Sequence, residues 1–158
     1  MASKVRVPKI KYTVEFLKIT CALKNIYGCN PYPKKYRYHA QLEEAIVAIN
    51  KAMKFDLCII DGNVVSGINP CRLGLVMSSQ DPVAIDVAAG EIAGVRSQSI
   101  RYLKIAANER LGNAAFYARG LPLNYFRSRY PKKNARTILT GKALALLTRS
   151  GLRKRLGF

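Results

Sequence analysis

Three aspartates stand where apolar runs end, and they are the residues with which this sequence could most readily do chemistry. Asp61 follows the run 57–60, Asp81 follows the run 73–77 and its polar end, and Asp86 lies five residues further on. Acidic and small polar residues at strand ends are typical of ligand sites in open α/β sheets. The pattern therefore predicts a site here, although it does not say which reaction, if any, takes place in it.

Two of these aspartates also have structural explanations. Asp81 precedes Pro82, and an Asp N-cap followed by proline at the first helical position is a strong helix start. Asp86 lies within VAIDVAAG, where nearly every neighbour is apolar or small. A buried carboxylate is costly unless it is paired or hydrogen-bonded. Asp86 therefore either ties its helix to a basic or backbone donor or belongs to a site, and both interpretations stay open.

Lys24 and His39 are the next candidates. Lys24 falls in the last turn of a helix expected over 14–27, which Gly28 ends. It either pairs favourably with the helix dipole, the interpretation that we favour, or clamps an anion beside the glycine turn. His39 is the only histidine. For it, a place at a helix start or in a hydrogen bond is favoured over a catalytic role.

Apolar periodicity predicts the elements that must position these side chains. Helices are expected over 14–27, 40–53 and 97–111, with another that begins at Asp81-Pro82. Strands are expected over 57–60 and 73–77, with a short edge strand at 5–7 and a last strand at 114–117. Residues 63–74 are expected to form a glycine-containing loop that matches no nucleotide-binding motif. A helix followed by a wholly apolar strand predicts an α/β fold whose layered, mostly parallel sheet has flanking helices.

Charge divides the chain of 158 residues, which has a net charge of +18. Residues 1–38 hold nine Lys/Arg and one acid, residues 39–118 hold seven Lys/Arg and eight acids, and residues 119–158 hold eleven Lys/Arg and no acid. We therefore expect an α/β domain over 1–118 and a basic C-terminal extension over 119–158. Leucines in 137–156 predict that the extension is helical and docked, with its basic face outward, although such a helix could instead lie on a membrane or on RNA.

Basic ends attract polyanions, so nucleic acid is an alternative partner. In the loop 29–39, tyrosines alternate with basic residues, a pattern that suits base stacking and phosphate contact but also a surface loop packed down by its tyrosines. The residues that would contact nucleic acid are Lys34, Lys35, Arg37, Arg127, Arg129, Lys132, Lys133, Arg153, Lys154 and Arg155.

Cysteine spacing and hydropathy limit the cofactors and the location. The four cysteines, at 21, 29, 58 and 71, include no CxxC pair, so zinc or an iron–sulfur cluster gains little support. Cys58 lies within an apolar run and is expected to be a small buried hydrophobe with a free thiol. No apolar run approaches the roughly 20 residues of a membrane span. The start MASKVRVPKIK lacks the apolar core of a signal peptide, so a cytoplasmic protein is expected.

Five short motifs, taken together, resemble the family called domain of unknown function 362. They are Val7–Lys11, Leu23–Gly28, His39, Ile59–Gly62 and Asp81–Asp86, and they occur in that family's order and spacing over about residues 5–115. Gly112 also fits its helix ending. Many members carry a ferredoxin-like module with CxxC runs; this chain has none, so an iron–sulfur role is not carried over.

Two departures from the family pattern matter. The family has Thr-His where this chain has Tyr12-Thr13, and only seven residues precede Pro8 where members carry a long segment. The chain therefore looks like the second half of the family's domain. If the other half supplies sheet strands, an exposed edge would call for a homo-oligomer or a separate partner protein that completes the sheet.

The resemblance implies a common cleft formed by residues distant in sequence: Lys9, Lys11, Lys24, Asn25, His39, Asp61, Asp81 and Asp86. The lysines, the amide and the histidine would suit an anionic small molecule. The three aspartates could hold a divalent cation, or Asp61, Asp86 and His39 could act in catalysis. The hypotheses are an anion-binding, metal-assisted cleft, a nucleic-acid-binding protein, and a non-catalytic subunit of a larger complex. The residues do not decide whether the protein is an enzyme.

Overall fold

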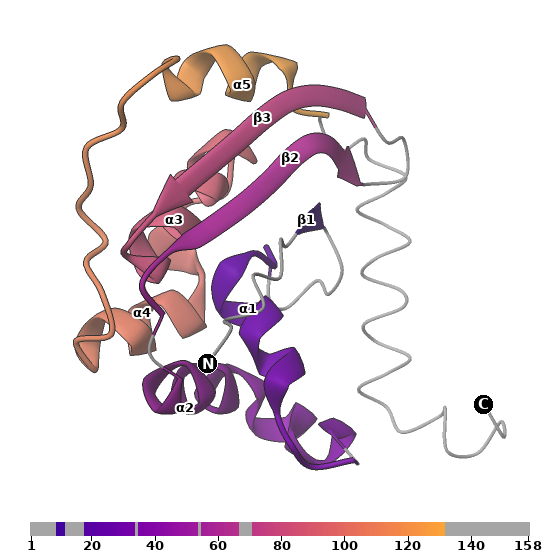
Figure 1. Ribbon diagram of the computed structural model, residues 1–158, viewed down its shortest axis with the longest axis vertical. Coiled ribbons are helices and arrows are strands. Elements are labelled where there is room, and N and C mark those ends of the chain that lie inside the picture. Colours follow the sequence, from indigo (N-terminus) through magenta and orange to yellow (C-terminus); the bar gives the residue numbers. More distant parts are fainter. Residues whose placement is uncertain (1–8, 12–17, 34, 54, 67–70, 132–158) are drawn as a thin grey trace, which may run out of the picture.

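The computed structural model describes residues 9–11, 18–33, 35–53, 55–66 and 71–131. The strands are β1 (Lys9–Lys11), β2 (Cys58–Ser66) and β3 (Cys71–Ser79). The α-helices are α1 (Ala22–Ile26), α2 (Leu42–Ala52), α3 (Pro82–Ile92), α4 (Arg101–Asn108) and α5 (Leu123–Arg129), and the 3-10 helices are η1 (Tyr27–Cys29), η2 (Lys35–Gln41) and η3 (Ser97–Ser99). Figure 1 shows the β2–β3 hairpin arching past α3, with α5 at one end of the molecule and α2 at the other.

The sheet has the order β1-β2-β3, and its main pairing is antiparallel. β2 and β3 pair along almost their whole length, with Ile60 opposite Met77, while the three-residue β1 runs parallel to β2. The expected mostly parallel sheet is therefore wrong, although the mixed α/β class is correct. Only residues 67–70 separate the two long strands, and a parallel pair needs a crossover of about a dozen residues or more.

The strands also extend further than the apolar runs indicate. Much of the loop expected over 63–74 is strand, because β2 continues to Ser66 and β3 begins at Cys71. On β2, Ile60 and Gly62 are buried, and the next buried residue is Val65, three positions on. A register shift between Gly62 and Val64 adds this extra residue, as a β-bulge does, and keeps the inner side chains facing the core.

The hairpin has a buried inner face and an exposed outer face, since successive side chains of a strand point to opposite sides. Cys58, Ile60, Leu73 and Leu75 lie in the core. On the outer face Val76 is 69% exposed. Gly62 belongs to the inner face, where an added Cβ would lie 3.1 Å from the Cβ of Leu75. An alanine there would require the Leu75 side chain to shift by a few tenths of an ångström.

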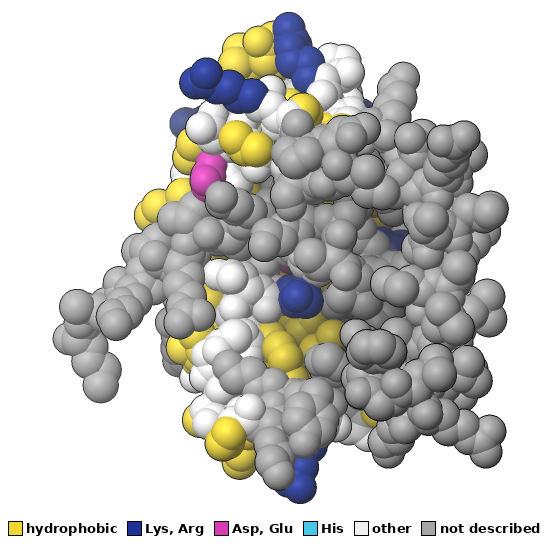
Figure 2. All heavy atoms as spheres, turned by 90° about the vertical axis from the view of Figure 1, so that its right-hand side faces the viewer, with side chains coloured by type: hydrophobic (Ala, Val, Ile, Leu, Met, Phe, Trp, Pro, Cys, Tyr) yellow, Lys and Arg dark blue, Asp and Glu magenta, His cyan; other side chains and the backbone are white. Residues whose placement is uncertain are grey.

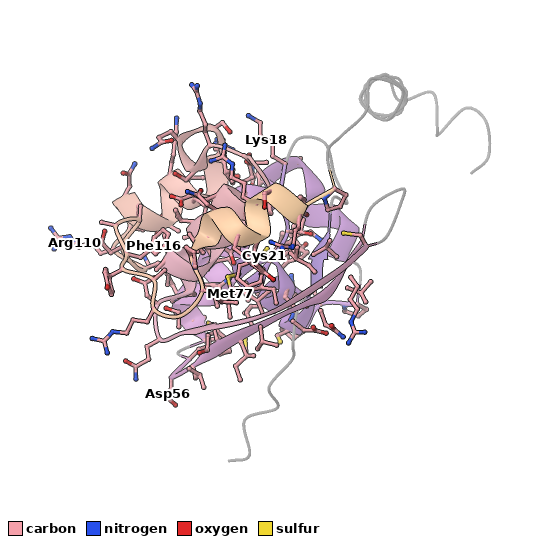
Figure 3. All side chains as sticks on the ribbon, turned by 90° about the horizontal axis from the view of Figure 1, so that it is seen from above. Lys18, Cys21, Asp56, Met77, Arg110 and Phe116 are labelled. Carbon is pink, nitrogen blue, oxygen red and sulfur yellow. The ribbon has the colours of Figure 1, made fainter. Side chains whose placement is uncertain are left out.

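α3 is the central helix and packs against both long strands and against α1, α4 and α5. Nearly all of its side chains are buried, which explains why its sequence is apolar on every side. Figure 3 shows the same division between inside and outside: Cys21 and Met77 lie within the molecule, whereas Lys18, Asp56 and Arg110 point outward. The core is therefore formed between the hairpin, α3 and the helices around it.

Some of the other expected helices and strands agree with the structure and others do not. The helix expected over 40–53 is confirmed as α2, and that over 97–111 divides into η3 and α4. The helix expected over 14–27 is shorter, since Lys18 has a φ of 59° and the described helix begins at Ala22; residues 12–17 lie outside the description. Residues 113–122 contain no strand, so the last strand expected at 114–117 is absent there.

The segment after Gly120 contains the helix α5, which packs against α3 and β3. Its Phe126 and the following Tyr130 are buried in the same core as the hairpin. The edge strand expected at 5–7 and the basic helix over 137–156 lie outside the described residues. The division at residue 118, with a docked extension, stays a prediction.

Candidate functional site

Asp86 is a buried carboxylate that caps a helix other than its own. Its Oδ1 accepts a hydrogen bond from the backbone N–H of Ala22 at 2.7 Å. Its Oδ2 accepts hydrogen bonds from the backbone N–H of Leu23 at 3.4 Å and from the Tyr102 hydroxyl at 3.2 Å. Ala22 begins α1, and the preceding Cys21 makes no side-chain cap hydrogen bond. The carboxylate of α3 therefore satisfies the first amides of α1. Of the two interpretations left open by the sequence, the structure favours the tie to backbone donors.

Burial dominates the electrostatics around this carboxylate. Desolvation raises the pKa of Asp86 to about 7, against the opposing effect of its three hydrogen bonds. Burial and, after it, the nearby Asp86 charge raise the pKa of Tyr102 and that of the Cys21 thiol well above their ordinary values. The phenol and the thiol therefore stay neutral, and with an exposed fraction of 0% Asp86 cannot contact a ligand in this conformation.

Cys58 is buried, as the sequence predicts, and all four cysteines are free. Burial raises the pKa of the Cys58 thiol to about 11, with smaller contributions from Asp86 and Asp81. A thiol with so high a pKa is a poor nucleophile and a poor metal ligand at neutral pH. Cys58 thus acts as a small hydrophobic side chain.

Asp81 caps its own helix, as its sequence position predicts. Its Oδ1 accepts the N–H groups of Val83 at 2.8 Å and Ala84 at 2.9 Å, and its Oδ2 accepts that of Asn113 at 2.6 Å. Gly112 lies so close that an added Cβ would meet the Asp81 carboxylate at 2.1 Å. Both oxygens of Asp81 therefore have structural partners, and one of them holds the chain that leaves α4.

Asp61 differs from the other two, because it lies on the outer face of the hairpin. It is half-buried, pairs with Val76 across the strands, and accepts the N–H of Asn63 at 2.8 Å. Within the described residues, no group of three or more His, Cys, Asp or Glu side chains could hold a metal ion. The structure thus separates Asp61 from the buried Asp86, and does not bring the expected metal-binding trio together.

The basic candidates come from elements that adjoin one another. In the sheet register, Lys9 of β1 pairs with Asp61 of β2, and Lys11 pairs with Ser66. α1, which carries Lys24 and Asn25, contacts β2. Figure 1 shows β1 between the hairpin and α1. The backbone therefore brings β1, β2 and α1 to one region, while His39 lies apart from it in η2, which packs against α2.

Four of the residues expected to bind nucleic acid lie on described elements, at two ends of the molecule (Figure 1). Arg127 and Arg129 belong to α5, whereas Lys35 and Arg37 belong to η2. Figure 1 shows α5 at one end and the chain between α1 and α2 at the other. The remaining candidates lie outside the described residues: Lys34, Lys132, Lys133, Arg153, Lys154 and Arg155.

The buried polar side chains that the sequence analysis did not predict include those of Tyr102 and Asn50. Tyr102 has an exposed fraction of 0% and binds Asp86, and Asn50 donates from Nδ2 to the carbonyl oxygens of Leu23 and Ile46, each at 2.8 Å. Asn50 stands on the apolar side of α2 next to Ile49, which was the one signal that it might be buried. With Asp86, Asn50 holds both the amide and the carbonyl of Leu23 in α1.

The hairpin, the central apolar helix and the capping aspartates define a small mixed α/β domain. Residues 2–91 match the family described as Domain of unknown function (DUF362). Because this match covers more than half of the chain, the protein belongs to that family, as its motifs indicate. No solved structure is significantly similar to the chain.

The chain is also similar to a thylakoid-associated protein of Synechocystis sp. strain PCC 6803. The two are 31% identical over 121 residues, which cover 68% of this chain and 37% of the relative. The chain thus aligns with little more than a third of this relative's length. Along the described part of the chain, no helix is long and apolar enough to cross a membrane. The cytoplasmic location and the oligomeric or completing partner stay predictions.

Proposed function

We propose that this member of the family binds an anionic small molecule where β1, β2 and α1 meet, through Lys9, Lys11, Lys24 and Asn25. The observation that carries the proposal is the way α1 is held. A five-residue helix is too short to be stable by itself. Here Asp86 fixes its first amides and Asn50 fixes the carbonyl of Leu23, the residue directly before Lys24.

The hydrogen bonds from Asp86 and Asn50 restrict α1, because breaking either would leave another buried polar group without a partner. The network around α1 therefore fixes the backbone from which Lys24 and Asn25 project, and both side chains are only half-buried. A cation and an amide on a fixed backbone suit a compact anion, since little backbone freedom remains to be lost on binding. β1 adds two further lysines at the neighbouring sheet edge, where Lys9 is the register partner of Asp61.

Asp61 is the carboxylate through which metal assistance or proton transfer would act, because Asp81 and Asp86 serve as caps. It is half-buried, and β1 places Lys9 beside it in the register. One protein carboxylate together with phosphate oxygens is a usual way to bind Mg²⁺. We therefore propose that any metal would bind together with the anion and not before it.

Isothermal titration calorimetry with inorganic phosphate and with pyrophosphate tests the proposal. Lys24→Gln should weaken binding by about tenfold to a hundredfold, since a charge-assisted hydrogen bond contributes about 1.5–3 kcal/mol. Lys104→Gln, on the exposed face of α4, removes the same charge and should leave the affinity unchanged. If both variants bind as the wild type does, or weaken equally, the proposed site is refuted.

A second titration separates the metal from the anion. Mg²⁺ added alone should give no heat, and Mg²⁺ added with pyrophosphate should tighten binding in the wild type but not in Asp61→Asn. Tightening of equal size in the variant would remove Asp61 from the proposal and leave anion binding intact.

A further inference from the structure

The face around α5 combines exposed apolar side chains with arginines. Leu121 is 59% exposed and Tyr125 is 42% exposed, and Arg119, Arg127 and Arg129 are exposed as well. We call these five residues the α5 face. Figure 2 shows basic and hydrophobic side chains next to one another at the end of the molecule where α5 lies. No acid occurs after Glu109 in the sequence.

The α5 face is fixed to the body of the protein from below. Phe126 and Tyr130 are 6% and 5% exposed and lie in the core, and α5 packs against α3 and β3. Tyr125 stacks edge-on against Phe126, with ring centroids 5.1 Å apart. The guanidinium of Arg129 lies 3.6 Å from the centre of the Tyr125 ring. Tyr125 and Arg129 are therefore presented together on a rigid support, and Arg127 lies on the other flank of α5, across the buried Phe126.

We propose that the α5 face docks on an anionic lipid surface. A tyrosine and a leucine beside arginines fit the interface between lipid headgroups and acyl chains, where an apolar body can enter while the charge stays in water. Arginines near such a surface each strengthen binding by about fivefold. The face lies outside residues 2–91, so the proposal concerns this chain and not the matched family domain.

Lipid is favoured over single-stranded nucleic acid by the chemistry of the face. Nucleic acid of this kind is bound by stacking its bases on free aromatic faces. One face of the Tyr125 ring is already covered by Arg129. Leu121, the more exposed of the two apolar side chains, offers no stacking surface. A lipid interface can bury both Leu121 and Tyr125 in the conformations that the structure shows.

Vesicle flotation with the full chain, purified free of nucleic acid, tests the proposal. Vesicles of phosphatidylcholine mixed with phosphatidylglycerol should bind the protein, and vesicles of phosphatidylcholine alone should bind it far more weakly. The double variant Arg119→Gln, Arg127→Gln should lower the partition coefficient by about 20- to 30-fold, because each arginine contributes about 1 kcal/mol. Leu121→Ser should lower it by about threefold to tenfold, since a half-exposed leucine gains part of its full burial energy.

Two matched controls make the test specific to this face. The double variant Arg96→Gln, Lys104→Gln removes the same charge from exposed positions near η3 and on α4. Val76→Ser removes an exposed apolar side chain from the outer face of the hairpin. Both should bind the mixed vesicles as the wild type does. Equal loss in the matched pairs would show attraction by overall charge and would overturn the proposal.

An oligonucleotide measurement decides between the two polyanions. If a single-stranded oligonucleotide binds tightly, Arg119→Gln with Arg127→Gln abolishes that binding, and mixed vesicles do not bind, the face is a nucleic-acid surface and the lipid proposal is overturned. Lys24→Gln should leave flotation unchanged, so failure of the anion site and failure of the α5 face can be told apart.

Discussion

Replacing Asp86 by asparagine tests whether this carboxylate is held in the core at an energetic cost. Burial raises its pKa from the ordinary value of 3.8 to about 7. Between these values the folded state holds a proton that the unfolded state has released, so stability falls as pH rises. A pKa difference of about three units corresponds to about 4 kcal/mol of folding stability. This stability is fully present below about pH 4 and is lost as pH rises through about 7.

Asparagine has nearly the same shape and cannot ionise. Its oxygen can accept the N–H of Ala22, and its amide can donate to the hydroxyl oxygen of Tyr102, the two groups that lie 2.7 and 3.2 Å from the carboxylate. The longer bond from the N–H of Leu23, at 3.4 Å, is lost because an amide nitrogen cannot accept it. The variant should therefore cost about 1–2 kcal/mol in acid, where the wild type carries a neutral acid. Toward pH 8 the wild type should lose up to about 4 kcal/mol of stability that the variant does not lose. The variant should therefore become as stable as the wild type, or more stable, as pH rises.

Urea unfolding of both proteins at several values between about pH 4.5 and pH 8 measures the free-energy gap between wild type and variant. Taking the difference removes the pH dependence that the two proteins share, including the mutual repulsion of a chain with net charge +18. Asp61→Asn removes the same group from the exposed face and corrects for the lost charge. A gap that widens as pH rises would mean that the ionised carboxylate stabilises the fold. A constant gap would mean that the pKa of Asp86 is the same in the folded and unfolded states, and either result would refute the reasoning.

Three further predictions follow from the packing. Gly112→Ala should destabilise the protein by about 1–3 kcal/mol, because its Cβ would meet the Asp81 carboxylate at 2.1 Å. In an Asp81→Ala background, urea unfolding should show that Gly112→Ala costs much less. An equal loss of stability in both backgrounds would contradict the contact. Cys29 should react quickly with a thiol reagent and Cys58 only on unfolding, since burial raises the pKa of Cys58 to about 11; equal rates in the native state would refute this. Phe126→Ala should cost about 3–5 kcal/mol if α5 is part of the core, whereas a single unchanged urea transition would show that it is not.

The sequence predicted the helices better than the sheet, for a physical reason. α2 and the start of α3 are specified locally, by an apolar stripe and by the Asp81-Pro82 cap. Strand direction is not specified locally; it depends on how many residues connect the strands. The bulge after Gly62 shifted the apolar alternation by one residue, so Val64 and Val65 did not continue the pattern of the run 57–60. The sequence therefore predicted β2 and β3 to be shorter than they are, and the loop between them to be longer.

The candidate site shows the same limit. The burial of Asp86 was predictable from its apolar neighbours, and the need for partners followed from the cost of a buried charge. The partners were not predictable, because Ala22 lies 64 residues away and donates through its backbone. A backbone N–H is present at every position except proline, so nothing in a side-chain pattern marks the one that will be used.

The family motif at Asp81–Asp86 is thus a pair of helix caps, and this changes where function should be sought. Asp81 caps α3 at Val83 and Ala84, and Asp86 caps α1 at Ala22. Both carboxylates lie on one helix, so the motif fixes α1 relative to α3. Positioning of this kind is useful to whatever α1 presents, which is Lys24 and Asn25. Asp86→Ala removes the acceptor for the Ala22 N–H, which asparagine would keep. If Asp86→Ala stays folded while its phosphate affinity falls, with Lys24 intact, the motif acts through α1 as we infer; an unchanged affinity would confine Asp86 to stability alone.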